Sequence, residues 1–176
     1  MVMASAGKTY LPAPAGVHQA VCVDVVDLGK IEVTFNNKTS LAHKIVLVWQ
    51  IDIPNPENEG RRFEVRRRYT NSLNAKANLR KELESWRGRA FSAEELKGFE
   101  LDNLLLKNCQ LQVVHAASAK DATQIFANVA AIMGITKGMT LLEPLNYVRV
   151  QDRKDDTQKQ MTAAAAADAS DEAVPF

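Results

Sequence analysis

The sequence has few cysteines, few aromatic residues and no long apolar run, and each shortage excludes a class of protein. Two cysteines among 176 residues are too few for a disulfide scaffold, and Cys22 and Cys109 stand in apolar runs, where we expect buried free thiols. No apolar run approaches the roughly 20 residues of a membrane-spanning helix. Residues 1–16 hold one lysine and no apolar segment of the secretory type, which favours a cytoplasmic protein.

Motifs for enzymatic chemistry are also scarce. The histidines His18, His43 and His115 lie far apart, and no HExxH or CxxC spacing predicts a zinc site. The segment Gly134–Gly138 contains glycines and a lysine, but not in the order of a phosphate-binding loop. We therefore expect no enzyme, no metal and no cofactor. A nuclease subunit is the most distant alternative, because it needs clustered carboxylates that the spacing does not reveal.

Net charge is balanced over the whole chain but not along it. Lys and Arg number 22 against 21 Asp and Glu, a formal charge of +1. Residues 1–150 hold 19 basic and 15 acidic residues, or +4, whereas residues 151–176 hold 3 and 6, or −3. The length and the 46% hydrophobic fraction predict one folded domain. We divide the chain into a flexible N-terminal arm over 1–16, a domain over 17–150 and a disordered acidic tail over 151–176. A loosely docked lead-in is the alternative for residues 1–16.

Apolar alternation predicts a mainly β domain. Strands are expected over 17–28, 43–53, 61–69, 109–115 and 125–133, with a weaker strand signal over 31–35. Gly29 is expected to end the first strand, and the doubled Val25-Val26 indicates a β-bulge or a strongly coiled strand. Asn36-Asn37 predicts a turn. A last extended piece is expected over Tyr147–Val150.

A helical segment interrupts the strands. Ala75, Leu79, Leu83 and Trp86 recur at helical spacing, so a helix is expected over Ala75–Arg87. A second short helix should begin at the capping box of Ser92 and end at Gly98. Three strands, a helical insert and two strands are the order of the OB-fold, a five-stranded Greek-key barrel. The alternative is an α+β domain with helices on one face of an antiparallel sheet.

Arginines crowd the third predicted strand. Five of the nine residues from Arg61 to Tyr69 are arginines, and alternation places Arg62, Arg66 and Arg68 opposite Phe63 and Val65. An OB-fold binds oligonucleotides across its second and third strands, so these cations predict a single-stranded-DNA site. A merely solvated face is the other interpretation of the run. Candidates added from the second strand and the helix are Lys44, Lys76, Arg80 and Arg87.

Aromatic side chains, on which DNA bases stack, make up only 6% of the chain. Tyr69, at the end of the arginine strand, is the best candidate. Trp49 is a second one, although it shares a strand face with Ile45, Leu47 and Ile51, and a place in the core is its alternative.

The last six residues carry a resemblance. Asp171-Glu172-Ala173-Val174-Pro175-Phe176 resembles the acidic tip of bacterial single-stranded DNA-binding proteins, with acidic residues before an apolar residue, Pro and a terminal Phe. In that family the tip recruits replication, recombination and repair enzymes. The resemblance makes Asp171, Glu172, Val174, Pro175 and Phe176 the expected partner-binding residues. This tip has fewer acidic residues than the usual form, which would weaken electrostatic docking.

The middle of the chain carries a second resemblance. Tyr69–Leu73 and Lys76–Arg89 look like small phage and prophage proteins that are encoded beside recombination genes and regarded as OB-fold single-strand binders. The similarity extends over roughly residues 10–150. The pattern of these proteins predicts a glycine immediately before Lys107, and this chain has Leu106 there.

Together these observations predict a phage-type protein of the host bacterial cytoplasm that binds single-stranded DNA without sequence preference. Its tail tip is expected to recruit an annealing protein, recombinase, exonuclease or polymerase. A protein–protein adaptor or recombination accessory factor is the main alternative. The sequence leaves the oligomeric state, including a homo-oligomer, and the choice between DNA and RNA open.

Overall fold

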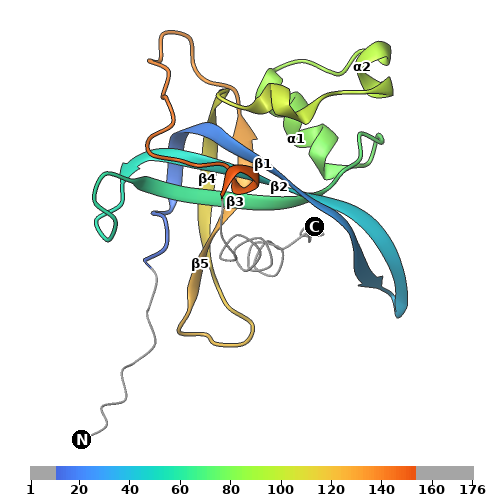
Figure 1. Ribbon diagram of the computed structural model, residues 1–176, viewed down its shortest axis with the longest axis horizontal. Helices are drawn as coiled ribbons and strands as arrows, with labels where there is room; N and C mark the ends of the chain where they lie inside the picture. Colours follow the sequence, from blue (N-terminus) through green and yellow to red (C-terminus); the bar gives the residue numbers. More distant parts are fainter. Residues whose placement is uncertain (1–10, 154–176) are drawn as a thin grey trace, which may run out of the picture.

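The computed structural model describes residues 11–153 and has a mainly β fold (Figure 1). Its five antiparallel strands form one sheet in the order β3-β2-β1-β4-β5. The strands are β1 (Gly16–Phe35), β2 (Lys38–Pro54), β3 (Arg62–Thr70), β4 (Asn108–Ala117) and β5 (Ile125–Met133). Within the described residues no backbone ladder joins β3 to β5, so hydrogen bonds do not close the sheet into a barrel.

Strand β1 is longer than the sequence predicted. It continues through Gly29, which has a φ of 67°, and includes residues 31–35. The bulges lie between Cys22 and Asp24 and between Asp27 and Gly29, so the bulge expected at Val25-Val26 is wrong. Apolar side chains cover both faces of β1 here. Val25 packs against the larger core cluster and Val26 belongs to the smaller one, so the two valines need no bulge.

The turn between β1 and β2 is the one that the sequence predicted. Asn36 and Asn37 have φ values of 50° and 59°, and Phe35 pairs with Lys38 across them. Positive φ at both central residues defines a type I′ turn, whose twist matches that of the flanking strands.

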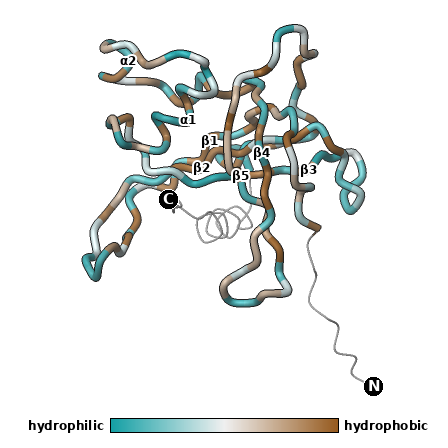
Figure 2. Tube along the Cα trace, turned by 180° about the vertical axis from the view of Figure 1, so that it is seen from behind, coloured by the Kyte–Doolittle hydropathy of each residue, from teal (hydrophilic) through white to brown (hydrophobic). Residues whose placement is uncertain are grey.

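Apolar side chains cover both faces of the central strands. Ile45, Leu47, Trp49 and Ile51 of β2 belong to the larger core cluster, as the alternation predicted. Val46 and Val48 belong to a smaller cluster on the opposite side, together with valines of β1. Figure 2 shows hydrophobic residues gathered where the strands cross. We call the side of β1, β2 and β3 away from the larger cluster the outer face.

The helical segment lies between β3 and β4 in the chain and covers the larger core cluster. Helix α1 (Asn78–Arg87) buries Leu79, Leu83 and Trp86 of the predicted stripe, whereas Ala75, its first predicted member, is exposed before the helix begins. It begins three residues later than expected, because a turn closed by the Ala77 amide on the Asn74 carbonyl precedes it. Helix α2 (Ala93–Lys97) has the predicted capping box, and the 3₁₀ helix η1 (Leu101–Leu104) leads into β4. No helix within residues 11–153 is long and apolar enough to span a membrane.

Side chains bridge the gap between β3 and β5. The Arg67 guanidinium donates to the Val129 carbonyl of β5 at 3.0 Å and pairs with the Glu82 carboxylate of α1. The Tyr69 hydroxyl donates to the same carboxylate. Burial raises the pKa of Tyr69 and of Glu82. Arg67 therefore faces the core side of the sheet and links β3 to β5 and to α1.

Two further expectations concern residues near the ends of the domain. Ala13 is 4% exposed and its carbonyl contacts the His115 ring nitrogen at 2.7 Å, which for this residue favours the docked lead-in over the flexible N-terminal arm. Residues 1–10 lie outside the described residues. Tyr147–Val150 forms no strand; a 3₁₀ helix, η2 (Val150–Asp152), begins at its end.

Both cysteines are buried free thiols, as expected. Burial raises the pKa of Cys22 to about 12 and raises that of Cys109 as well. Neither thiol is therefore ionised near neutral pH.

Leu83→Ala should reduce the free energy of unfolding by about 2–5 kcal/mol, because Leu83 is fully buried and its loss leaves a cavity. Lys81→Ala, at an exposed position of the same helix, should be nearly neutral. Urea denaturation of both variants measures the difference. Equal, small losses would show that α1 does not pack on the core in this way.

Candidate nucleic-acid interface

The outer face of β2 and β3 brings the predicted cations of the two strands together. The register pairs Val46 with Arg68 and Val48 with Arg66, so the side chains of both strands alternate in step. As the alternation predicts, the arginines at 62, 66 and 68 point away from the core. The outer-face side chains of these strands include Lys44, Val46, Val48, Gln50, Asp52, Arg62, Glu64, Arg66 and Arg68.

Lys44 and Arg68 lie near each other on this face. Lys44 is 3% exposed and its ammonium donates to the Thr70 hydroxyl at 2.6 Å. Burial, followed by repulsion from Arg68, lowers the pKa of Lys44, and burial lowers that of Arg68. Two cations from neighbouring strands therefore add to the positive charge at this end of the face.

The other two arginines of this face contact a carboxylate and a backbone carbonyl. Arg66 lies 3.9 Å from the Glu64 carboxylate and keeps 35% of its side chain exposed. Arg62 donates to the Glu143 carbonyl at 2.8 Å. Burial raises the pKa of Glu64, with Arg66 among the nearby positive charges that oppose the shift. Cations thus outnumber the two carboxylates of these strands, Asp52 and Glu64.

The predicted stacking residues lie in the core. Tyr69 is 2% exposed and Trp49 is fully buried, so neither ring offers a face to a base. Trp49 packs against Trp86 with 6.1 Å between ring centroids. Tyr69 fails as a stacking candidate because alternation places it on the same side as Phe63 and Val65, and Glu82 satisfies its hydroxyl. For Trp49, the structure supports the core alternative.

The predicted cations of the helical segment are not part of the outer face. Helix α1 packs on the opposite, core side of the sheet. Arg80 pairs with Glu84 at 3.0 Å, and Arg87 pairs with Glu95 at 2.7 Å while lying over the Phe91 ring. Lys76 is exposed in the turn before the helix. Helical spacing places these residues near one another, but tertiary packing separates them from the arginine strand.

A segment after β5 crosses part of the outer face. We call residues 140–153 the strap. The Gln50 side chain donates to the Leu145 carbonyl and accepts from the Leu145 amide, both at 2.8 Å. Arg62 reaches the strap through Glu143. No periodic pattern in the sequence marks this segment, and its covering role was not predicted.

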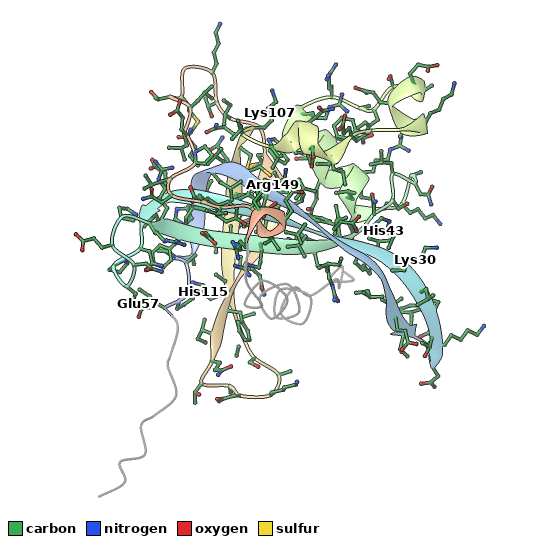
Figure 3. All side chains as sticks on the ribbon, viewed as in Figure 1. Lys30, His43, Glu57, Lys107, His115 and Arg149 are labelled. Carbon is green, nitrogen blue, oxygen red and sulfur yellow. The ribbon has the colours of Figure 1, made fainter. Side chains whose placement is uncertain are left out.

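A buried carboxylate fastens the end of the strap. Asp24, 1% exposed beside the first bulge of β1, accepts hydrogen bonds from the Tyr147 hydroxyl and the Val150 amide, both at 2.8 Å. The Arg149 guanidinium pairs with it at 3.1 Å and reaches Asp102 at 3.5 Å. Figure 3 shows Arg149 over the middle of the sheet. Burial and the Asp24 charge raise the pKa of Tyr147, so its hydroxyl stays protonated.

A cavity of about 550 Å³ lies where the strap meets β1 and η1. Its lining includes the acidic residues Asp27, Glu100 and Asp102 beside Arg149. Such a wall repels phosphate, so the cavity lies outside the candidate interface. Within residues 11–153, no three side chains of His, Cys, Asp or Glu are grouped as metal ligands would be.

Two exposed aromatic rings are not among the residues that the sequence predicted for the site. Phe35 is 76% exposed beside the β1–β2 turn, and Phe126 is 36% exposed near the β4–β5 loop. The signal for Phe35 was its position next to Asn36-Asn37, because a residue at a hairpin turn lies far from the core. Compared with family models, curated proteins and solved structures, the chain has no significant match.

Asp24→Asn should reduce the free energy of unfolding by about 3–5 kcal/mol, because Arg149 loses the partner of a buried ion pair. Amide exchange at Val150 should accelerate as the strap loosens. The matched control is Asp102→Asn, whose side chain is 56% exposed, and it should cost less than about 1 kcal/mol. Similar, small effects of both changes would show that Asp24 does not fasten the strap.

Proposed function

We propose that this protein binds single-stranded DNA without sequence preference and protects it during phage replication and recombination. The observation that carries the proposal is the group of cations on the outer face of β2 and β3, which are Lys44, Arg62, Arg66 and Arg68. Cationic grooves that follow a phosphate backbone bind single strands regardless of sequence. The proposed role is not enzymatic.

The sheet supports an OB-fold as the finer description of the domain. Strand β1 lies at the centre and pairs with both β2 and β4, with β3 and β5 at the two edges. A small Greek-key barrel needs these edges to approach each other, and Arg67 reaches from β3 to the Val129 carbonyl of β5. OB-folds bind oligonucleotides on the face of strands 2 and 3, where the cations of this chain lie.

The strap limits the proposed site to part of the outer face. It covers Gln50 and Asp24, whereas Arg66 keeps about a third of its side chain exposed. Arg66 and Arg68 are therefore the proposed phosphate contacts, with buried Lys44 adding positive charge behind them and Arg62 at the edge of the strap. Bound DNA would follow the part of β2 and β3 near Thr70.

Recruitment of replication or recombination proteins is proposed for the tail. Its expected binding residues, Asp171, Glu172 and Val174–Phe176, lie outside the described residues. The support is the resemblance of these residues to the acidic tip of bacterial single-stranded DNA-binding proteins. A terminal Phe and its carboxylate would supply an apolar anchor and charge-assisted hydrogen bonds.

A protein–protein adaptor is the second candidate function, and one observation favours it. The strap exposes three large apolar side chains: Leu141 at 62%, Leu145 at 38% and Val148 at 55%. Exposed apolar patches often mark protein contacts. The salt dependence of single-stranded-DNA binding separates the two candidates, because an adaptor would bind DNA weakly or not at all.

Replacing Arg62, Arg66 and Arg68 together with Ala should weaken binding to oligo-dT. Each phosphate contact contributes about 0.7 to the slope of log affinity against log salt. The slope should therefore flatten by about two units, which a titration at several salt concentrations measures.

The matched control for this variant removes Lys81, Arg89 and Lys97, three exposed cations of the helical segment. It changes the net charge equally, and its slope should remain close to that of the unchanged protein. If both triple variants behave alike, the cations of the outer face form no specific site.

Deleting residues 161–176 should leave DNA affinity equal or slightly higher, most visibly at low salt. The deletion removes Asp168, Asp171 and Glu172 and no basic residue, so an anionic competitor for the cationic face is lost. Recruitment of partner proteins should collapse. Nuclease-treated pull-downs with full-length and truncated protein compare the partners.

Two narrower variants separate the contributions of the tail. Removing Phe176 alone should abolish most recruitment and leave DNA binding unchanged. Replacing Asp168, Asp171 and Glu172 with Asn or Gln should reproduce the change in DNA binding. Identical partner lists for full-length and Phe176-deleted protein would contradict a recruiting tip.

A further inference from the structure

The end of the β1–β2 hairpin extends beyond the rest of the sheet. Strand β4 pairs with β1 only over Gly16–Val21, and the pairing of β3 with β2 ends at Lys44. Residues 30–41 therefore form a two-stranded ribbon, which we call the arm. Figure 1 shows the arm leading away from the sheet at the lower right, and Figure 3 shows Lys30 near it.

The strand register defines which face of the arm continues the cationic face. After the second bulge, Gly29 pairs with Lys44, Ile31 with Ala42, Val33 with Ser40 and Phe35 with Lys38. Because Lys44 lies on the outer face, strand alternation places these partners on the outer face as well. The other face of the arm carries the pairs Lys30–His43, Glu32–Leu41 and Thr34–Thr39.

Phe35 occupies a fixed and exposed place at the tip of this face. Its side chain is 76% exposed, and the type I′ turn that follows it holds the hairpin in one conformation. A large apolar ring in water gains free energy when another flat apolar surface covers it. The position therefore favours a ligand with flat rings.

Charge along the same face identifies the ligand more closely. Lys38 pairs with Phe35 at the tip, and Lys44 and Arg68 lie on the same face at the base. Six residues of strand separate Lys38 from Lys44, about 20 Å at 3.3 Å per residue. The acidic residue of the arm, Glu32, is on the opposite face. This face therefore has cations at both ends and an exposed aromatic ring at its tip. Phosphates and bases along a single DNA strand match these two kinds of contact.

We propose that the outer face of the arm extends the DNA site and that Phe35 stacks on a base of the bound single strand. This inference rests on the proposed function and adds a contact beyond β2 and β3. The bound strand would run from Lys44 and Arg68 along the arm, with Lys38 on a phosphate near its tip. The arm supplies the aromatic contact that buried Tyr69 and Trp49 do not.

A second copy of this chain fits the same surface less well. A two-fold contact through the outer face of the arm would bring Lys38, Lys44 and Arg68 of one copy toward the same cations of the other. Like charges that meet across an interface oppose association. Negatively charged DNA meets no such barrier.

The test compares Phe35→Ala with Leu41→Ala. Both side chains are exposed on the arm, at 76% and 66%, but Leu41 pairs with Glu32 on the opposite face. Phe35→Ala should weaken oligo-dT binding about tenfold and leave the salt slope unchanged, because it removes a stack and no charge. Leu41→Ala should bind like the unchanged protein. Equal losses in both variants would overturn the assignment to one face.

A fluorescent variant gives a second readout. Phe35→Trp places an indole at the tip, and oligo-dT should quench its emission when a base stacks on it. The unchanged protein provides the background from Trp49 and Trp86, which are buried. Lys38→Ala should reduce the salt slope by about 0.7, the value for one phosphate contact.

The outcomes separate this inference from the proposed function. If the unchanged protein does not bind oligo-dT, both are overturned. If it binds with the salt slope set by the outer-face arginines, but Phe35→Ala binds equally well and Phe35→Trp is not quenched, only the role of the arm is overturned. A dimer that Phe35→Ala converts to a monomer, measured by light scattering, would assign the arm to self-association instead.

Discussion

Pairing of β1 with two different strands is the constraint on which the rest of the structure depends. Strand β4 holds β1 up to Val21, and β2 holds it from Ala20 to Phe35. At the point of exchange, the amide of Cys22 donates to the Lys107 carbonyl at 3.0 Å, and its carbonyl accepts from the Leu106 amide at 2.9 Å. Beyond that point β1 is bound on one side only. Both the strap site at Asp24 and the projecting arm follow from this change of partner.

Patterns that depend on one buried face could be predicted from the sequence. Alternation in β2 and β3 assigned Leu47 to the core and Arg66 to the outer face, because a shift by one residue would reverse every side chain. The left-handed backbone of Leu106, at a φ of 67°, lies where a glycine was expected. Alternation also accounts for the failure of Tyr69, which was chosen for its neighbours in the chain rather than for its face.

Contacts between distant segments could not be predicted. Gln50 and Leu145 are hydrogen-bonded although they lie 95 positions apart in the chain, and no local sequence pattern indicates such a contact. The inward ion pair of Arg67 with Glu82 likewise depends on how α1 packs. These contacts decide how much of the outer face stays open. The composition of the face could thus be predicted from the sequence, whereas its extent could not.

The ion pair between Asp24 and Arg149 makes the two sides of the sheet depend on different lengths of chain. The two residues are 125 positions apart. The larger cluster takes all its side chains from Ala13 to Ile132. The valines of the smaller cluster are instead covered by Leu142, Tyr147 and Val150 of the strap. A chain that ended after β5 would therefore keep every side chain of the larger cluster but leave the valines of the outer face in contact with water.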